Sequence, residues 1–310
     1  MGYRILTQRT ALQLVLTAAL LWMSAPSIIH AQGRGARGGP PSTAKASAPI
    51  DLTGYWTAVI NEDWRLRMLT GARGDFGAGG AGTQVFPGGT GAVVTLGTGA
   101  NPAFLGSIPY KLNGAQAALV WNPAKDEAEG NQCKAYGAPG IMRQPTHLHI
   151  TWQDDNALKI EADYGTQSRL FHFGPPPRGG AMNYGGGIYV PPEITKLEEP
   201  PGTQPSWQGF SAASWTIMGG GRTMEKGGNL TVVTGHLKPG YYLKNGMLYS
   251  GNAVLTEHFR LMELPDGSTW ITLVQIVEDP EYLTQPFVVN YQFKKLPDGS
   301  KWNPTPCSVK

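Results

Sequence analysis

Apolar and polar residues alternate along short segments from residue 144 onward. A period of two is typical of strands that bury one face and expose the other. The first three segments, residues 146–152, 157–164 and 168–173, are separated by a polar turn and by a turn that contains glycine. Because short turns join neighbouring antiparallel strands, these segments predict an antiparallel meander.

A second series follows a stretch rich in proline and glycine at residues 174–205, and Pro-Asp-Gly turns lie between or beyond its members. These segments span residues 211–218, 229–236, 253–263, 268–278 and 287–295. Short strands with turns about every 8–12 residues indicate a barrel or a sandwich rather than alternating strands and helices. The predicted fold class is therefore all-β, an antiparallel meander that forms a barrel or barrel-like sandwich with long Gly/Pro-rich loops.

Composition supports this fold class. The chain of 310 residues contains 42 Gly and 25 Pro, and only 15% of its residues are charged, against roughly 25% in a typical domain. Helix-rich classes are therefore disfavoured, whereas 9 Trp, 12 Tyr and 9 Phe supply enough apolar bulk for a core. The formal net charge of +3 is too small for a nucleic-acid-binding surface, so no nucleic-acid partner is expected.

Residues 1–31 have the pattern of a secretory signal peptide. Arg4 and Arg9 precede an apolar run at residues 11–23, and Ala31 ends a small-residue cleavage site. That run is too short to span a bilayer comfortably, which favours cleavage over the alternative of an uncleaved anchor. The mature protein is then expected in the periplasm or outside the cell, with no stable membrane span.

The rest of the chain is expected to form one domain. Residues 32–50 are predicted to be a flexible linker, and residues 51–310 a single β domain with a glycine-rich excursion at residues 71–102. The alternative is two fused barrel-like lobes, at about residues 51–175 and 205–310.

The chain contains two cysteines, Cys133 and Cys307. An even number of cysteines in an oxidising compartment usually forms disulfides, so we expect these two to pair. The alternative is a pair of buried thiols.

Several motifs are shared with a widespread group of exported bacterial proteins of unassigned biochemistry, which this chain resembles over about residues 130–295. The matching segments are Cys133 to Pro139, Arg169, Trp207 to Trp215, Leu230 to Thr234, Tyr249-Ser250, Thr256 to Phe259 and Asp279-Pro280. The resemblance implies a lipocalin-like antiparallel β architecture and implies no particular reaction. Gly54-Tyr55-Trp56 likewise resembles the first strand of lipocalin-like barrels.

Alternation places His147 and His149 on the same face of one predicted strand. Two such imidazoles can bind a divalent metal if a carboxylate from a neighbouring strand completes the site, and the candidates are Glu257, Asp163 and Asp154. The alternative is a histidine pair that lines a polar barrel interior or lies on an exposed sheet face. A divalent metal is the cofactor that this pattern suggests.

Glu257 lies in the otherwise apolar run Leu255, Glu257, Phe259, Leu261, and its face is therefore expected to be buried. A buried carboxylate must be paired or protonated, which favours either an acid/base role or a structural ion pair with Arg169 or Arg260. The predicted catalytic set is Glu257, His149, Asp163 and Arg169. Asp163 and Asp279 also fit turn caps at strand ends.

Aromatic residues in the predicted strands could line a pocket or fill the core. The predicted ligand-binding residues are Trp207, Trp215, Tyr249, His172 and His258. His258 follows Glu257 directly, so the two side chains are expected on opposite faces.

Three functions are compatible with these patterns. The first is an exported β-barrel protein that binds a small apolar or aromatic molecule, either without chemistry or with acid/base chemistry of the hydratase, isomerase or lyase type. The second is a metal-dependent enzyme that uses the histidine pair and a carboxylate. The third is a non-catalytic envelope or interaction protein.

Overall fold

The computed structural model describes residues 43–59, 108–174, 204–218 and 227–309, all of which belong to one compact unit, Ser42–Lys310. The predicted signal peptide at residues 1–31 and the glycine-rich excursion at residues 71–102 lie outside the described residues. Among the residues that are described, no helix is long and apolar enough to cross a membrane.

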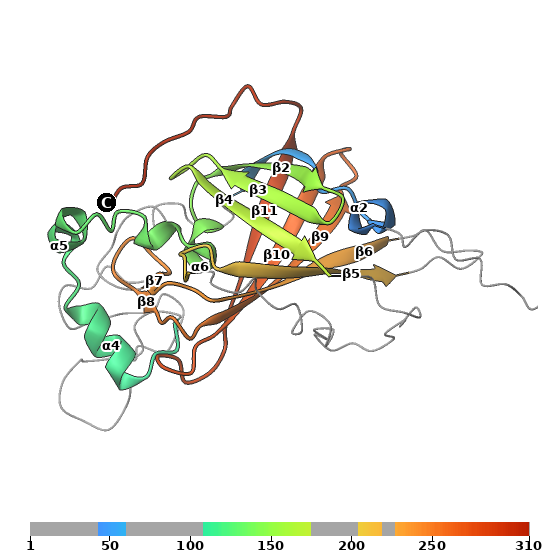
Figure 1. Cartoon of the computed structure of the whole chain (residues 1–310). Coiled ribbons are helices and arrows are strands. Elements are labelled where there is room, and N and C mark those ends of the chain that lie inside the picture. Colours follow the sequence, from blue (N-terminus) through green and yellow to red (C-terminus); the bar gives the residue numbers. More distant parts are fainter. Residues whose placement is uncertain (1–42, 60–107, 175–203, 219–226, 310) are drawn as a thin grey trace, which may run out of the picture. The chain divides into compact units, whose positions relative to one another are not determined.

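The strands form a closed barrel in the order β1-β11-β10-β9-β6-β5-β4-β3-β2 (Figure 1). Their bounds are β1 (Gly54–Val59), β2 (His147–Asp154), β3 (Ala157–Ala162), β4 (Gln167–Phe173), β5 (Phe210–Met218), β6 (Gly227–Gly235), β9 (Val254–Glu263), β10 (Thr269–Glu278) and β11 (Phe287–Leu296). Strand β1 pairs with both β2 and β11 and so closes the barrel. The prediction of an all-β barrel is therefore confirmed.

Each strand predicted from the alternation is present within two residues of its expected bounds. Strands from both candidate lobes, residues 51–175 and 205–310, take part in the same barrel, because β1 joins β11 and β4 joins β5.

One strand pair departs from the predicted antiparallel pattern. Strands β4 and β5 are parallel, with Phe171 beside Ser211 and Phe173 beside Ala213. A parallel pair requires a long connection, and the chain between β4 and β5 supplies that length. The alternation of apolar and polar residues does not depend on strand direction, so the sequence could not distinguish a parallel from an antiparallel pair.

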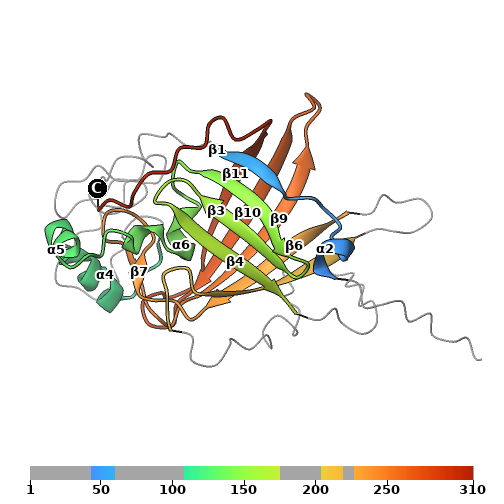
Figure 2. The same cartoon turned by 45° about the horizontal axis from the view of Figure 1, so that its top comes forward.

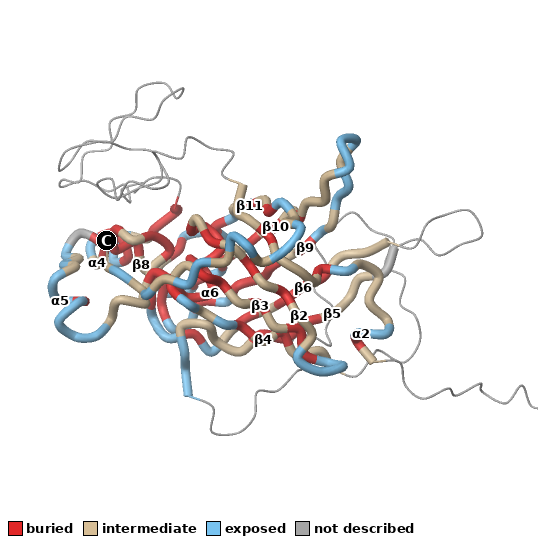
Figure 3. Tube along the Cα trace, turned by 90° about the horizontal axis from the view of Figure 1, so that it is seen from above, coloured by how far each residue is buried: buried red, intermediate tan, exposed pale blue. Residues whose placement is uncertain are grey.

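The core fills the inside of the barrel, because alternate residues of every strand point inward. Figure 3 shows the buried stretches along the strands and the exposed segment around α5 (Pro123–Ala128). The buried side chains of this core include Trp56, Leu148, Ile150, Leu158, Ile160, Phe171, Phe259, Ile271, Leu273 and Phe293.

The two ends of the barrel are covered by different segments (Figure 2). The helix α2 (Ala44–Ser47) lies at one end, which we call the α2 end. The opposite end, which we call the disulfide end, is covered by α4 (Leu112–Leu119), α5, η1 (Lys134–Tyr136), α6 (Ala138–Ile141), β7 (Gly240–Tyr241) and β8 (Leu248–Tyr249). A second apolar cluster at the disulfide end includes Tyr110, Tyr242, Met247, Tyr249, Leu255 and Phe287.

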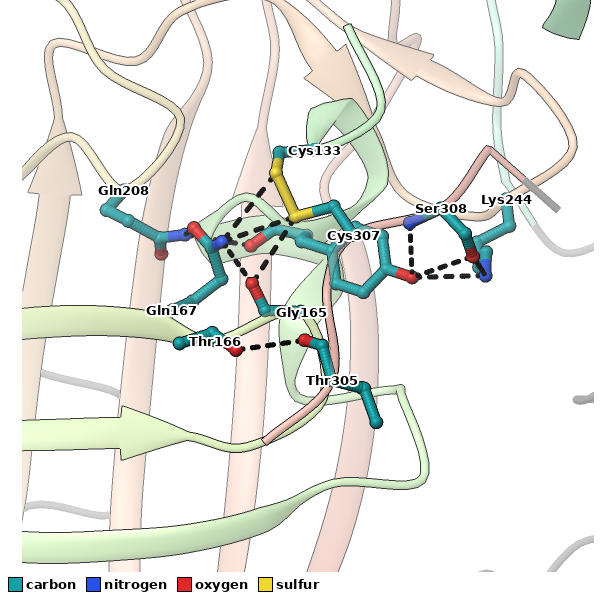
Figure 4. Close-up of a disulfide and its surroundings, with 10 residues drawn as sticks. Cys133, Gly165, Thr166, Gln167, Gln208, Lys244, Thr305, Cys307 and Ser308 are labelled. Carbon is teal, nitrogen blue, oxygen red and sulfur yellow. Dashed lines mark hydrogen bonds between the residues drawn. A yellow bond between two sulfur atoms is a disulfide. The ribbon is translucent and has the colours of Figure 1, made fainter. Parts of the chain in front are cut away.

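The disulfide Cys133–Cys307 is formed, as predicted, with a Cα–Cα distance of 5.1 Å (Figure 4). It fixes the C-terminal tail, residues 297–309, to the segment that precedes η1. Thr305 strengthens this attachment, because its amide donates to the carbonyl of Asp163.

Part of the predicted linker, residues 43–50, is described and packs on the barrel. Thr43 caps α2 through its side chain, which accepts a hydrogen bond from the amide of Ala46, as N-cap residues do. Ala44 is buried in this contact. Composition alone did not reveal that this segment would have a surface to pack against.

Candidate functional site

The interior of the barrel contains an ion pair between Arg169 of β4 and Glu257 of β9. Nη1 of Arg169 donates to Oε1 of Glu257 at 3.1 Å, and Nη2 donates to Oε2 at 2.5 Å. Glu257 is 0% exposed and Arg169 is 3% exposed. Of the two predicted partners, Arg169 therefore makes the contact, whereas Arg260 is exposed.

Other polar side chains surround this pair. Gln275 donates to Oε1 of Glu257 at 2.9 Å, and Arg169 also donates to the hydroxyl of Thr234 at 3.2 Å. Within the described residues, Nε of Arg169, Oε1 of Gln275 and the hydroxyl of Tyr249 are buried without a hydrogen-bond partner. Buried groups of this kind are commonly satisfied by ordered water.

The surroundings of Glu257 favour a structural ion pair. Both of its carboxylate oxygens accept hydrogen bonds, and the side chain is closed off from solvent. A general acid or base must reach its substrate directly or through one water molecule. The acid/base role of Glu257 and Arg169 stays a prediction, and the contacts give it no added support.

His258 lies on the outer face of β9, opposite Glu257, as strand alternation requires. Its Nδ1 lies 3.1 Å from the hydroxyl of Thr231, and its Nε2 is buried without a described partner. Burial lowers the pKa of His258, although the charge of Glu257 opposes this shift.

His172 lies on β4 between residues that face the core, and its ring stacks on Phe210 at a centroid distance of 5.0 Å. Burial lowers the pKa of His172, and the charge of Asp154 acts in the opposite direction. His172 and His258 therefore both lie on the outer face of the barrel wall, and their ligand-binding role stays a prediction.

His147 and His149 share the outer face of β2 but bind different carboxylates. Nδ1 of His147 lies 2.7 Å from Oδ2 of Asp163, and Nδ1 of His149 lies 3.3 Å from Oε2 of Glu161. The ring of His149 also stacks on Tyr55 at 4.2 Å. No group of three metal-binding side chains occurs among the described residues, so the proposed metal site has no support there.

Asp163 mainly connects two segments of the chain through hydrogen bonds. Its carboxylate accepts hydrogen bonds from the amide of His147 at 2.7 Å, from the hydroxyl of Thr146 at 3.1 Å and from the amide of Asn303 at 3.1 Å. These contacts join the start of β2 to the C-terminal tail. They fit the turn-capping alternative better than a catalytic role.

The predicted aromatic ligand residues lie at different ends of the barrel. Tyr249 is fully buried at the disulfide end, and Trp207 lies there as well, with its indole N–H donating to the carbonyl of Pro239 at 3.2 Å. Trp215 lies at the α2 end, where its indole N–H donates to the carbonyl of Ala44 at 2.9 Å. These residues therefore do not form one site.

A hollow of about 610 Å³ lies at the α2 end and opens to solvent. It is lined by Lys45, Ala48, Pro49, Ile50, Asp51, Thr53, Thr151 and Trp152. Trp152 belongs to an aromatic cluster, because its ring lies 5.6 Å from that of Phe173 and 6.4 Å from that of Trp215. All three rings pack partly against the barrel core.

Hydrogen bonds hold the wall of this hollow in place. The amide of Ala44 donates to Oδ1 of Asn156, and the amide of Lys45 donates to the carbonyl of Asp155, each at 3.0 Å. Asp51 folds back on the chain, since its carboxylate accepts from the amide and the hydroxyl of Thr53. The wall is therefore tied to the β2–β3 turn.

Sequence reasoning missed the residues of the hollow. Trp152 and Phe173 lay in correctly predicted strands. Trp152 lies near the end of β2 and Phe173 ends β4, and both strands pair with β3. Two aromatic residues near the ends of strands on either side of a common neighbour, β3, were the available signal. The wall formed by residues 45–53 carried no such signal, because it comes from the predicted linker and the segment after it.

Comparisons with family models, curated proteins and solved structures found no match to this chain. The resemblance to a group of exported bacterial proteins therefore stays an interpretation of the motifs. The closed β-barrel is compatible with the lipocalin-like architecture that this resemblance implied.

Proposed function

We propose that this protein is an exported β-barrel that binds a small apolar or aromatic molecule in the hollow at the α2 end. The observation that carries the proposal is the position of Trp152, which lines the hollow and contacts Phe173 and Trp215. An aromatic ring on an open wall offers a stacking surface to a planar ligand. The volume of about 610 Å³ lies within the range of small-molecule sites.

The lining has the mixed character of such sites. Pro49, Ile50 and Trp152 offer apolar surface, whereas Lys45, Asp51 and Thr53 offer polar groups. A few polar groups around an apolar wall orient a ligand and provide specificity. We therefore expect a ligand with a flat apolar body.

Binding without chemistry is the better supported form of this function. The hollow lies at the end of the barrel, whereas Glu257 and Arg169 are buried among the interior side chains and bind each other. No described carboxylate–histidine pair lines the hollow. The acid/base form would require a ligand to reach the interior pair.

Export is the second part of the proposal. The disulfide Cys133–Cys307 supports an oxidising compartment, and the pattern of residues 1–31 supports a cleaved leader. Mass measurement of the protein recovered from the periplasm or medium should give a chain that begins at Gln32. Recovery of the full-length chain from the cytoplasm would contradict export.

Titration with the neutral fluorescent probe N-phenyl-1-naphthylamine tests the binding site. The substitution Ala48→Trp places a large side chain in the hollow and should weaken probe binding at least tenfold without removing a core residue. Trp270→Leu is the matched control, because Trp270 is a half-buried aromatic residue that does not line the hollow.

The two variants together decide the location. Weaker binding in Ala48→Trp with unchanged binding in Trp270→Leu supports the hollow. Equal probe affinity in Ala48→Trp and the unmodified protein, or no probe binding at all, would contradict it.

A further inference from the structure

Three polar side chains meet beside the disulfide, and none of them lines the hollow at the α2 end. Nζ of Lys244 donates to Oγ of Ser308 at 2.8 Å and to the hydroxyl of Tyr136 at 3.1 Å. The hydroxyls of Ser308 and Tyr136 lie 3.3 Å apart, so the three groups form a closed triangle. Figure 4 shows Lys244 and Ser308 next to Cys307.

The fold brings these side chains together from distant parts of the sequence. Tyr136 ends η1, Lys244 lies between β7 and β8, and Ser308 follows Cys307 directly. The disulfide therefore fixes Ser308 within reach of Tyr136. The backbone amide of Ser308 adds a further contact, because it donates to the hydroxyl of Tyr136 at 3.1 Å.

The ring of Tyr136 has little freedom to move. Gly165 has a φ of +84°, and a Cβ at that position would lie 2.2 Å from the ring of Tyr136. On another side, Tyr136 stacks on Tyr164 at a centroid distance of 5.5 Å. The phenol oxygen is therefore held in one place relative to Ser308.

The contacts of Tyr136 favour its phenolate form. Burial by itself raises the pKa of Tyr136, but hydrogen bonds from Ser308 and Lys244 together with the charge of Lys244 outweigh burial and lower it. Among the described residues, the titratable groups that contact Tyr136 are Lys244 and Tyr164, and the hydroxyl of Tyr164 lies 3.4 Å from Nζ of Lys244. Ser308 itself is exposed, so a compound in solution can reach its hydroxyl.

We propose that Ser308 is a nucleophile for activated esters and phosphonyl fluorides, with Tyr136 as its base and Lys244 as the cation beside the reacting atoms. A hydroxyl nucleophile is weak by itself and needs an adjacent base within hydrogen-bond distance. Serine with a lysine partner is a known variant of this arrangement. The triangle of Ser308, Tyr136 and Lys244 supplies a nucleophile, a base and a positive charge.

The proposed acyl transfer needs no reactant other than the ester and water. Oγ of Ser308 forms a bond to the ester carbonyl carbon while its proton passes to the phenolate of Tyr136. The carbon–oxygen bond to the leaving alcohol then breaks, and the phenol of Tyr136 returns the proton to that alkoxide. Water next attacks the acyl carbon and loses a proton to Tyr136. The bond between that carbon and Oγ of Ser308 then breaks, and the phenol of Tyr136 returns the proton to Oγ, which releases the carboxylic acid and free Ser308.

A purely structural role for the triangle predicts a different result. Hydrogen bonds that only attach the tail would stabilise the fold and would leave Ser308 no more reactive than another exposed serine. Ser300 provides this comparison, because it lies in an exposed turn of the same tail. Its amide donates to the carboxylate of Asp298, and no hydrogen bond from a lysine or a tyrosine to Ser300 is found among the described residues.

Labelling of the intact, disulfide-bonded protein with an alkyl fluorophosphonate tests the proposal by mass spectrometry. In this reaction Oγ of Ser308 bonds to phosphorus, fluoride leaves, and the proton passes to Tyr136. We expect one adduct per chain, located on the peptide that contains Ser308. Ser308→Ala should abolish the adduct, Ser300→Ala should leave it unchanged, and Tyr136→Phe should slow labelling at least tenfold.

Two further measurements keep the test decisive. Reduction of Cys133–Cys307 should slow labelling of the same chain, because Ser308 is then no longer fixed beside Tyr136. The labelling rate should also increase with pH and level off below the usual pKa of tyrosine. No adduct, an adduct that persists in Ser308→Ala, or equal labelling of Ser300 would overturn the proposal.

Discussion

Arg169 and Glu257 join β4 to β9 through two parallel hydrogen bonds inside the barrel, at 3.1 Å and 2.5 Å. These strands are not neighbours, since β5 and β6 lie between them in the barrel. The ion pair therefore links opposite parts of the wall through the interior. Its two charges neutralise each other where water is excluded, which a buried pair requires.

Removal of one charge from this pair should destabilise the fold strongly. Glu257→Gln leaves the guanidinium of Arg169 buried without a counter-charge, and we expect a loss of about 3–5 kcal/mol in the free energy of unfolding. Urea denaturation measures this loss. Glu263→Gln, at the exposed end of the same strand, is the control and should change stability by less than about 0.5 kcal/mol.

This variant also separates the two interpretations of Glu257. A Glu257→Gln protein of unchanged stability would contradict the structural ion pair. If such a protein had also lost the turnover of a substrate, the acid/base interpretation would be the correct one.

Loss of the disulfide should free the C-terminal tail before it affects the barrel. The loop that Cys133 and Cys307 close spans 174 residues, and its closure contributes on the order of 5 kcal/mol as an upper bound. In Cys133→Ser/Cys307→Ser, hydrogen exchange at the amides of Asn303 and Thr305 should accelerate, because both donate to Asp163. Exchange in β10 should change least, and equal acceleration at both places would contradict this order of unfolding.

Stability should decrease at alkaline pH because of buried tyrosines. Burial raises the pKa of Tyr249, and burial also raises the pKa of Tyr242 and Tyr241. Their contribution is fully present below the unfolded pKa of about 10 and is lost as the pH rises toward the folded values. Each tyrosine should contribute a slope of about 1.4 kcal/mol per pH unit.

Tyr249→Phe isolates one of these contributions. Urea denaturation at several pH values above 10 should show a slope smaller by about 1.4 kcal/mol per pH unit than that of the unmodified protein. Identical slopes would show that Tyr249 ionises equally in the folded and unfolded states, against the burial that the structure assigns to it.

The stability of the fold should also decrease at acidic pH, because of two histidines. Burial lowers the pKa of His258 and of His172, so each contributes stability above the unfolded pKa of about 6.5. This stability is lost as the pH falls from there through the folded values. The difference in unfolding free energy between pH 7 and pH 5 should therefore be smaller in His258→Gln, and smallest in the double variant with His172→Gln.

The strands were predictable because an alternation of apolar and polar residues along most of them reports the buried face. Leu255, Glu257 and Phe259 show how this works, since the apolar neighbours of Glu257 placed it correctly in the interior. The helices at the disulfide end left weaker signals. The pair Asn122-Pro123 was one, because Asn122 caps α5 and Pro123 takes its first turn.

The candidate site was less predictable because its position depends on how strands meet in space. Trp215 and Tyr249 looked equivalent in the sequence, yet they lie at opposite ends of the barrel. Strand register and the direction of β5 decide which aromatic residues meet, and the local alternation of apolar and polar residues reveals neither of them. The contact between Trp152 and Trp215 therefore emerged only from the fold.

The indole N–H signals of the tryptophans report whether a ligand binds in the hollow at the α2 end. Heteronuclear NMR spectra of ¹⁵N-labelled protein are recorded while N-phenyl-1-naphthylamine is added. If the ligand binds there, the signals of Trp152 and Trp215 shift with a common saturation curve, whereas those of Trp121, Trp270 and Trp302 stay in place. Saturable shifts at Trp270 or Trp302 without any change at Trp152, or no shift at any indole, would contradict binding in the hollow.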